Sequence, residues 1–557
     1  MTAVVSNAAV AEILERHGRL LEIAGESPFR TRAFTRAAES IRVYPRRVSE
    51  VAAEGRLRDI PGIGEGIATA VKQILDTGSF DAHNQLAGRI PESLIEIIAI
   101  PGVGAKTALR LHSDLGVDNL AALEDALAAG RVRAAKGLGA RAEATMLAGI
   151  EEVRRRSGRL PLGAALPVAR AFLTAYSELR PQDMVSVAGS ARRWEVTVGD
   201  LDFVIASTDL AGAAAAITDL AMVTDVAWSD ERSLRISLAN GLHADVLLTD
   251  PGSWGTSLLL ATGNALHIER LGSIPENAAT EEEIYALRGL PYVPPELRSG
   301  DEEFERFEEI SSLVTIADIN AEFHAHTTWS DGAASVSQMA EAAAARGYSL
   351  LGITDHSHSL GVAGGLDVER LRQQRLEIDA ANSEDSVQLL TGAEIEVHRD
   401  GSLDFDDETL ASLDVVVASL HTGLRQPREE ITARLLRVLE NPNVDIIAHP
   451  SGRLIERREG GDFDWEQVFE VAARTDTALE INADPARLDL DPALAYRASR
   501  AGCLITINCD AHHPAGFSLM EYGVAMARRA WLKPNQILNC WSPGQVLDWL
   551  SSRRRPV

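Results

Sequence analysis

Residues 323–331, FHAHTTWSD, are the first of six short segments in the last third of the chain that carry metal-ligating side chains. The others are TDH at 354–356, GAE at 392–394, SLH at 419–421, AHP at 448–450 and CDAH at 509–512. Together they supply six histidines and three carboxylates: His324, His326, Asp331, His356, Glu394, His421, His449, Asp510 and His512. Because one ion needs fewer ligands, the set predicts a centre for two or three metals.

The position of these segments predicts the fold around them. Apolar residues 415–418 run into His421, residues 444–448 run into His449, and residues 505–508 lead to Asp510. A lone histidine there is as often a packed core residue, but nine ligands at strand ends are not explained in that way. Buried strands that end in ligands and alternate with helical stretches predict a distorted β/α barrel from residue 316 onward. A centre with several divalent ions suits the hydrolysis of phosphate esters.

Length and composition limit the class of protein. A chain of 557 residues is too long for one core, so several domains are expected. No apolar run reaches membrane-spanning length and the first residues lack a signal-peptide pattern, so we expect no membrane contact. Three cysteines cannot form a disulfide framework, which indicates a reducing cytoplasm. The closing arginines at 553–555 are expected to form a frayed tail.

Charge is spread unevenly along the chain. The net charge of −27 argues against a simple basic DNA-binding protein. However, residues 1–160 carry 22 Lys and Arg against 20 Asp and Glu, whereas residues 161–557 carry 32 against 61. The N-terminal part is therefore the one expected to meet a polyanion.

A repeated glycine motif supports this expectation. IPGIG at 60–64 recurs as IPGVG at 100–104, and KGLG at 136–139 is a weaker third copy. Each is a tight turn before a helix, and the exposed backbone N–H groups there can hold a phosphate without reading the base. The predicted DNA contacts are Gly62, Gly64, Gly102, Gly104, Lys106, Gly137 and Gly139. Residues 7–53 have the apolar spacing of helices. The arginines in this stretch could contact a polyanion, and a solvated charged surface is the alternative interpretation of them.

The middle of the chain holds a second set of carboxylates. Asp200 and Asp202 are two apart on a predicted strand and so project from the same face. Asn240-Gly241 predicts a hairpin between strands at 234–238 and 242–248, and its second strand carries Asp245. Three carboxylates on adjacent strands can hold two divalent ions, one at a 3′-hydroxyl and one at a triphosphate. The predicted nucleotide contacts are Gly189, Ser190, Arg193, Gly199 and Gly263.

With these motifs the chain resembles bacterial family X DNA polymerases, which join a polymerase-beta-like core to a C-terminal PHP (polymerase and histidinol phosphatase) domain. The resemblance also covers ESPFR at 26–30, GLPYVPPELR at 289–298, VAGGL at 362–366 and LEINA at 479–483. It implies a multidomain α/β protein with helical DNA-binding domains, a nucleotidyltransferase palm and a C-terminal distorted (β/α)7 PHP barrel. The implied domains are a lyase-like helical domain at 1–85, a fingers-like helical region at 86–160, a palm at 161–250, a shortened thumb and linker at 251–315 and a PHP domain at 316–557.

The resemblance also implies cofactors and partners. Mg²⁺ or Mn²⁺ is expected at the palm, and two or three ions of Mn²⁺, Zn²⁺ or Fe²⁺ at the PHP centre. The expected partners are gapped, nicked or 3′-ended DNA and a deoxynucleoside triphosphate. The protein is expected to be a monomer and to be cytoplasmic and nucleoid-associated.

Three departures from the family pattern affect the expected activities. Leu260-Ala261 stand where the family carries a Tyr-Phe pair that stacks on the sugar, and the stretch from Gly272 to Gly289 is short, which predicts a reduced thumb. Ala70 stands where the family's lyase lysine is expected, and Lys72 is predicted to be an ordinary exposed lysine. Glu322 and Glu396 replace aspartates but are not among the nine ligands.

Three interpretations are open at this point. The first is a gap-filling repair polymerase with an attached 3′–5′ exonuclease or phosphoesterase. The second is a DNA end-processing nuclease or phosphatase whose polymerase core is weak or lost. The third is a DNA-binding scaffold without catalysis. The altered pocket favours the second, whereas the three aspartates favour the first, because a costly cluster of like charges has no evident use in an inactive palm.

Overall fold

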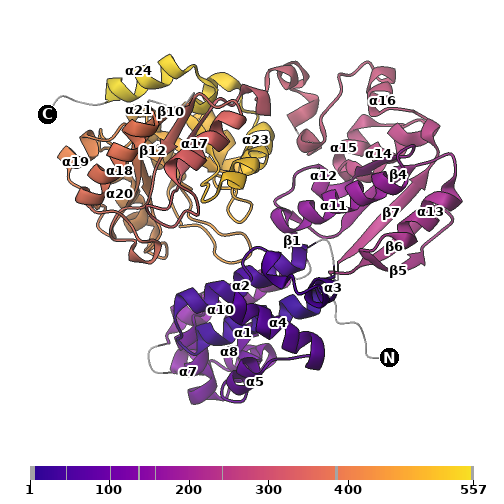
Figure 1. Ribbon diagram of the computed structural model, residues 1–557, viewed down its shortest axis with the longest axis horizontal. Helices are drawn as coiled ribbons and strands as arrows, with labels where there is room; N and C mark the ends of the chain where they lie inside the picture. Colours follow the sequence, from indigo (N-terminus) through magenta and orange to yellow (C-terminus); the bar gives the residue numbers. More distant parts are fainter. Residues whose placement is uncertain are drawn as a thin grey trace. The chain divides into compact units, whose positions relative to one another are not determined.

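The computed structural model describes residues 7–44, 47–98, 100, 102–135, 138–156, 159–240, 242–300, 302–382 and 387–553. The chain divides into two units, residues 1–295 and residues 296–557 (Figure 1). The first unit holds a helical region and a mixed sheet, and the second holds a seven-stranded parallel sheet. The division falls inside the predicted segment 251–315, and the finer domain boundaries stay predictions.

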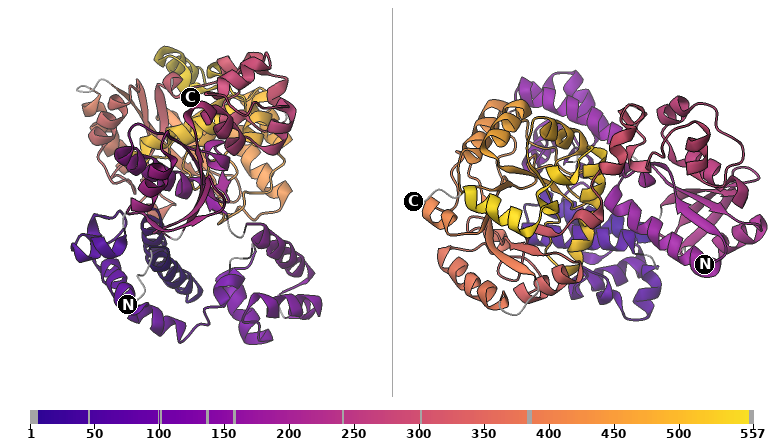
Figure 2. Two further views of the ribbon diagram at one scale, coloured as in Figure 1. Left: turned by 90° about the vertical axis from the view of Figure 1, so that its right-hand side faces the viewer. Right: turned by 90° about the horizontal axis from the view of Figure 1, so that it is seen from above.

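Residues 7–53 form helices, as predicted, and helices continue to residue 156, indigo to purple in Figure 2. They are α1 (Asn7–Ile23), α2 (Pro28–Val43), α3 (Val48–Ala53), α4 (Glu65–Thr77), α5 (Asp81–Ala87), α6 (Leu94–Ile98), α7 (Ala105–Leu115), α8 (Leu120–Ala128), α9 (Arg131–Ala134) and α10 (Ala140–Arg156). In α1 the spacing of Val10, Leu14 and Leu21 places them on one face, where all three are buried. This face packs α1 against α2 and α4.

His17 of α1 lies inside the helical core, with 1% of its surface exposed. Its ring packs edge-on against Phe34 and Phe80, with centroids 4.6 and 4.7 Å away, and the His83 ring lies at 5.8 Å. Neither ring nitrogen of His17 has a hydrogen-bond partner within the part of the chain that the structure describes. Burial, followed by the charges of His83 and Arg30, lowers the pKa of His17 to about 4, so the imidazole is neutral near pH 7.

A five-stranded mixed sheet follows, with strand order β2-β4-β7-β6-β5. The strands are β2 (Met184–Val187), β4 (Leu201–Ala206), β5 (Val223–Trp228), β6 (Ser233–Leu238) and β7 (His243–Thr249), and β1 (Leu160–Pro161) pairs separately with β3 (Thr197–Val198). Strands β6 and β7 form the predicted hairpin, although Gly241 lies outside the described residues. Strand β4 pairs with β7 in parallel, which places Asp202 beside Asp245.

The helices of this part are α11 (Leu162–Leu179), α12 (Gly189–Arg192), α13 (Leu210–Asp219), α14 (Trp254–Thr262), α15 (Ala265–Leu271) and α16 (Glu281–Leu287). Helix α13 contains the alanine run at 213–216. Leu258 of α14 shares an apolar cluster with Ala188 and with Val204 of β4. Because Ala188 directly precedes α12, this cluster holds the short helix against β4.

The second unit is built on seven parallel strands that follow one another in sequence order across the sheet. They are β8 (Ala321–Ala325), β9 (Leu350–Ile353), β10 (Gln388–Glu396), β11 (Val415–Ser419), β12 (Ile446–Ile447), β13 (Ala478–Asn482) and β14 (Ile505–Asn508). A parallel bridge between Ala325 and Ala511 joins the two ends, so the sheet is nearly a closed barrel, as predicted. Val415, Val416 and Val417 are fully buried, as expected of a strand covered on both faces.

Helices alternate with these strands. They are α17 (Val336–Ala345), α18 (Val368–Ala381), α19 (Asp407–Ala411), α20 (Arg428–Leu439), α21 (Trp465–Thr475), α22 (Pro492–Arg500), α23 (Met520–Arg529) and α24 (Pro543–Arg553). Between residues 301 and 315, short 3₁₀ turns lie at Glu302–Phe304 and Phe307–Ser312. Because each strand runs in the same direction into its loop, the loops after the strands gather at one rim.

The end of α24 corrects the prediction of a frayed tail at Arg553, whereas Arg554 and Arg555 lie outside the described residues. Arg553 is not frayed: its side chain is 6% exposed, and its Nε lies 3.2 Å from Oδ1 of the fully buried Asp445. Its guanidinium also donates to the carbonyl oxygens of Thr475 and Val444. The second oxygen of Asp445 accepts from the backbone N–H of Val416 at 2.8 Å. Arg553 therefore supplies the counter-charge that lets a carboxylate lie inside the barrel.

The neutral burial of His17 predicts that acid destabilises the helical region. The pKa of His17 is about 4 in the folded chain, against an ordinary value of 6.5. The free energy of unfolding is therefore unaffected by His17 above pH 6.5 and decreases as the pH falls from 6.5 towards 4, because the unfolded chain binds the proton first. At about pH 5 the loss corresponds to roughly 2 kcal/mol. A His17→Leu variant should lose less stability than the wild type between about pH 7.5 and about pH 5 in calorimetric unfolding. Equal losses in the two proteins would contradict the prediction.

Candidate functional site

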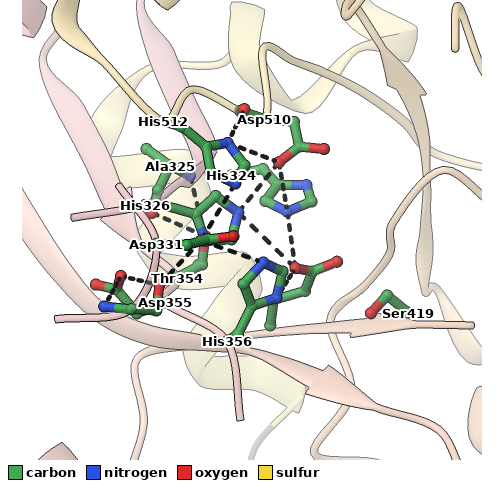
Figure 3. Close-up of polar contacts among 12 residues, drawn as sticks. His324, Ala325, His326, Asp331, Thr354, Asp355, His356, Ser419, Asp510 and His512 are labelled. Carbon is green, nitrogen blue, oxygen red and sulfur yellow. Dashed lines mark hydrogen bonds and ion pairs between the residues drawn. The ribbon is translucent and has the colours of Figure 1, made fainter. Parts of the chain in front are cut away.

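The nine predicted ligands of the second unit come together at the rim of the barrel. His324 lies on β8 and Glu394 on β10, and the other seven lie in the loops that follow β8, β9, β11, β12 and β14. Figure 3 shows His324, His326, His356 and His512 gathered with Asp331 and Asp510. His449 and Asp510 have φ angles of 29° and 52°. Residues other than glycine rarely adopt this backbone region, and those that do are often found at functional sites.

The ligand atoms form four overlapping groups, and the atoms of each group lie within 4.8 Å of one another. The groups are His326, Asp331, His356 and His512; His324, Glu394 and His449; His324, His326 and Asp510; and His356, Glu394 and His421. Every predicted ligand belongs to at least one group. The shared members link the groups, as in a centre that holds more than one ion.

The burial and chemistry of these residues fit divalent metal ions. His324 Nε2 is buried and, among the described residues, has no hydrogen-bond partner. It lies 3.6 Å from Oε2 of Glu394 and 3.6 Å from Oδ1 of Asp510, separations suited to ligands of one ion. Leaving this nitrogen without a partner would cost stability, so an ion bound by it is the simplest way to satisfy it. Histidine and carboxylate ligands suit Zn²⁺, Mn²⁺ and Fe²⁺ and do not select one of them.

The charges of the ligands balance one another inside the site. Burial, then the charges of His512 and His356, lowers the pKa of His326 to about 3, so this ring is neutral and free to act as a ligand. Burial alone would raise the pKa of Asp331, but its hydrogen bond to His512 and nearby imidazoles hold that pKa at about 2. Burial would likewise raise the pKa of Glu394, yet the surrounding histidines keep it well below its usual value. The carboxylates are therefore ionised and ready to bind cations.

A buried acid that the sequence analysis did not assign orients two of these ligands. Glu480 of β13 is fully buried, and its Oε1 lies 2.8 Å from Nδ1 of His324. Its Oε2 accepts from the backbone N–H of His449 at 2.6 Å. A carboxylate behind a metal-binding histidine fixes which ring nitrogen faces the ion. An acid between the apolar residues Leu479 and Ile481 of a short buried strand is the sequence signal that could have found it.

Two further acids position ligands from behind. Oε2 of Glu396 lies 2.7 Å from Nδ1 of His421, which turns Nε2 of that ring toward the centre. Asp355, beside His356, accepts hydrogen bonds from Thr327 and Ser330 and from Gln374. The bonds from Thr327 and Ser330 hold the loop that presents Asp331. Glu396 is not among the nine predicted ligands but contacts one of them.

The three aspartates predicted for the palm also come together. Asp200 directly precedes β4, Asp202 lies on β4 and Asp245 lies on β7, and their oxygens form a group within 4.8 Å. Burial raises the pKa of Asp202 to about 7, and the charges of Asp200 and Asp245 add to this. Arg235 of β6 donates to both oxygens of Asp245, at 2.8 and 2.7 Å. The set can hold divalent cations, which would relieve the repulsion between the carboxylates.

Gly189 lies against these carboxylates. Its φ of +60° is left-handed, and a Cβ built there would lie 1.8 Å from Oδ2 of Asp202. Only glycine fits this position, because any side chain would displace the aspartate. Ser190 follows it in α12.

The other predicted nucleotide contacts lie around the same sheet. Gly199 lies in the turn between β3 and β4, and Gly263 ends α14. Arg193 donates to the carbonyl oxygen of Thr262. An open cleft of about 360 Å³ is lined by Asp202, Arg235, Asp245 and Ala261 among others. Ala261 offers a methyl group where the resemblance expects an aromatic ring.

The two described glycine turns have the same geometry. Gly62 and Gly102 have φ angles of +80° and +90°, and Gly64 and Gly104 immediately precede α4 and α7. Flanking apolar residues anchor both turns in the core, namely Ile60 and Ile63 in the first and Ile100 and Val103 in the second. Helix N-termini with free backbone donors are anion sites, so this geometry suits a phosphate.

Open space lies in front of these helices. A Cβ built on Gly64, Gly104 or Gly139 would meet no atom within 4 Å. Lys106 is exposed on α7. The third copy is described from Leu138 onward, so Gly137 lies outside the described residues. On α4, Lys72 is exposed, as predicted, and Ala70 is buried.

Comparison with known domain families agrees with this architecture. Residues 5–80 match a helix-hairpin-helix domain, residues 94–152 a SAM-like helix-hairpin-helix tandem, and residues 322–484 the PHP domain. The PHP match includes the ligands from His324 to His449, whereas Asp510 and His512 lie beyond it.

Known proteins are similar over different lengths. The DNA polymerase/3′–5′ exonuclease PolX of Bacillus subtilis (strain 168) is 35% identical over 564 residues, which cover 97% of this chain and 98% of that protein. The chain belongs to the PolX family. The family resemblance expected from the motifs is thereby confirmed. Two shorter relatives of this PolX chain are probable phosphatases.

Both phosphatases match less than half of the chain. That of Thermoanaerobacter sp. (strain X514) is 26% identical over 42% of this chain and 95% of its own length. That of Shewanella sediminis (strain HAW-EB3) is 30% identical over 41% of this chain and 93% of its own length.

None of the described helices combines the length and apolar character needed to cross a membrane.

The contacts of Glu480 predict a weaker metal centre when its charge is removed. A Glu480→Gln variant should bind divalent metal about tenfold more weakly, because His324 loses the carboxylate that orients its ring. Metal content after dialysis, measured by mass spectrometry, tests this. Glu470→Gln, an exposed glutamate of α21, is the control and should keep the wild-type content. Equal metal retention by both variants would refute the role of Glu480.

Proposed function

We propose that this chain is a DNA repair enzyme with two active centres. The palm extends a primer by copying a template across a gap, and the PHP barrel removes material from DNA 3′ ends as a 3′–5′ exonuclease or phosphoesterase. The observation that carries the proposal is the convergence of two separate ligand sets, nine side chains in the barrel and three aspartates in the palm. Similarity to the Bacillus PolX over 97% of the chain supports both activities.

In the barrel the proposed substrate is the last phosphodiester of a DNA strand. Divalent ions at such a centre lower the pKa of water and neutralise charge on the phosphoryl oxygens. Water adds to phosphorus and the P–O3′ bond breaks, which releases a nucleoside 5′-monophosphate and leaves a 3′-hydroxyl that gains a proton. The chain's own part is to orient the ligands through Glu480 and Glu396 and to keep Glu394 away from bulk water.

In the palm the proposed substrates are a primer 3′-hydroxyl and a deoxynucleoside triphosphate. Mg²⁺ or Mn²⁺ bound by the aspartates would neutralise the triphosphate. The 3′-oxygen attacks the α-phosphorus, pyrophosphate leaves, and Asp245 is proposed to take the hydroxyl proton. Since Arg235 occupies both oxygens of Asp245, this ion pair must open for that step. Gly189 lies against Asp202 and Ser190 follows it in α12, and both are proposed to bind the phosphates.

The helix-hairpin-helix regions are proposed to bind gapped, nicked or 3′-ended DNA through its backbone phosphates. The open N-termini of α4 and α7 support this, as does the positive charge of the first 160 residues relative to the rest. Binding of this kind is independent of sequence and weakens with salt. We propose that the protein acts as a monomer in the cytoplasm, associated with the nucleoid.

A second function is favoured by one observation. Ala261 lines the palm cleft beside Asp202 and Asp245, so a methyl group stands at the position where the family resemblance expects an aromatic ring to stack on a nucleotide sugar. An end-processing nuclease or phosphatase with weak or lost polymerase activity would also agree with the probable phosphatases among the relatives. A scaffold without catalysis is opposed by the two intact ligand sets.

Two double variants distinguish these functions on a labelled, one-nucleotide gapped DNA with Mn²⁺ and the matching nucleotide. Asp200→Ala with Asp202→Ala should abolish primer extension and leave shortening intact. His324→Ala with His326→Ala should abolish shortening and leave extension intact. Shortening without any extension by the wild type would instead support the end-processing nuclease. Loss of both activities in either variant would contradict the proposal of two separate centres.

Because Gly189 lies so close to Asp202, adding one methyl group at position 189 should severely slow primer extension. A Gly189→Ala variant should extend the primer at least about a hundredfold more slowly, because the new Cβ would displace Asp202 from the metal-binding set. Gly252→Ala is the matched control, since a Cβ there meets no atom within 4 Å. Primer extension by Gly189→Ala at the control rate would show that Asp202 tolerates displacement.

A further inference from the structure

Three arginines lie on loops that follow ligand-bearing strands of the barrel. Arg425 lies in the loop after His421, Arg458 in the loop after His449, and Arg487 in the loop after β13. The backbone N–H of Ile455 donates to the carbonyl oxygen of Ala486 at 2.7 Å, which ties the second loop to the third. None of the three arginines is among the metal ligands.

Arg487 reaches the metal centre itself. Its side chain is 15% exposed, and its Nε lies 3.7 Å from Oδ2 of Asp510. Its Nη1 is buried and has no hydrogen-bond partner within the described part of the chain. Its charge also helps, after burial, to lower the pKa of His449 to about 4. A buried guanidinium N–H without a partner is costly, so a ligand that accepts from it is expected.

Among the described residues, the Arg458 guanidinium makes one hydrogen bond, from its Nε to the carbonyl oxygen of Gly452 at 2.9 Å. Burial, followed by the charge of Arg487, lowers the pKa of Arg458, and the charge of the exposed Arg425 adds to this. Asp489 acts in the opposite direction, but its oxygens already accept from the backbone N–H groups of Ser451 and Gly452. Like charges are thus held together beside the centre.

Arg453 shows what a purely structural arginine looks like in the same loop. It donates to the carbonyl oxygens of Arg487 and Leu488 and forms an ion pair with Asp491 at 3.4 Å. Its guanidinium is therefore used to join two loops. Arg425, Arg458 and Arg487 lack such a set of bonds among the described residues, which leaves their guanidinium groups available to an outside anion.

We propose that Arg425, Arg458 and Arg487 form a subsite for the phosphodiester backbone of a DNA strand next to the linkage being cut. This rests on the proposed nuclease function and deepens it: the barrel selects polynucleotides over small phosphate esters. Guanidinium groups suit the role because they are weakly hydrated and present a planar fork of donors to phosphate oxygens. The metal ligands take the scissile phosphate, and the arginines take its neighbour.

The test compares a single-stranded oligonucleotide of about six nucleotides with bis(p-nitrophenyl) phosphate, a diester that has no neighbouring phosphate. The full-length, Mn²⁺-loaded protein carries Arg425→Ala, Arg458→Gln or Arg487→Gln. Each variant should raise KM for the oligonucleotide about tenfold and reduce the slope of log KM against log salt by about 0.7. For the small diester, kcat/KM should stay within about twofold of the wild type in Arg425→Ala and Arg458→Gln.

The control is Arg372→Ala, an exposed arginine of α18 that pairs with Glu369 on its own helix, and it should change neither substrate. Arg425 is exposed, so its variant stays informative if Arg487→Gln fails to fold. An unchanged oligonucleotide KM and salt slope in Arg425→Ala with Arg458→Gln would overturn the subsite. Equal losses on both substrates would also overturn it and assign the arginines a structural role.

The same assay separates this inference from the proposed function. If the wild type cleaves the small diester but not the oligonucleotide, the nuclease proposal fails. The oligonucleotide is then tested as a competitive inhibitor of diester hydrolysis. Inhibition that weakens in Arg425→Ala would uphold the subsite without the nuclease, and absence of inhibition would overturn both.

Discussion

The burial of the Glu394 carboxylate is the constraint on which the barrel's centre depends. Its side chain is 1% exposed, and its oxygens lie 2.6 Å from Nδ1 of His356 and 3.1, 3.4, 3.6 and 3.8 Å from Nε2 of His449, His421, His324 and His326. A charge removed from water is tolerated only when cations or donors lie close to it. Strands β8, β9, β11 and β12, which present these histidines, must therefore keep their positions around β10. The fold and the metal centre consequently stabilise each other.

The parts of the molecule that could be predicted are those with a local signature. Ligands that follow apolar runs predicted both the strands and the rim where they meet, since parallel strands end together. Asp200 and Asp202 were found from a spacing of two, and Asp245 from a hairpin whose turn is encoded by Asn240 and the next residue. The glycine turns were found because left-handed backbone and an open helix start require glycine at fixed positions.

The parts that were missed depend on partners far away in the sequence. Glu480 looks like an irregularity in an apolar strand until His324, on another strand, is placed 2.8 Å from it. Arg553 was wrongly expected to fray because a run of arginines at a chain end is typical of solvated surface, and nothing local points to Asp445. The arginines around Arg487 lie on three separate loops, so only the folded barrel brings them together.

The bridge between Ala325 and Ala511 affects the order in which the protein folds during synthesis. Ligands of the centre come from both ends of the barrel sequence, so the centre cannot assemble on a ribosome until β14 has emerged. The helical region and the five-stranded sheet belong to a unit that ends at residue 295 and has apolar clusters of its own, and N-terminal units generally fold first during synthesis. A nascent chain therefore completes the half proposed to hold and extend DNA before it completes the half proposed to degrade it.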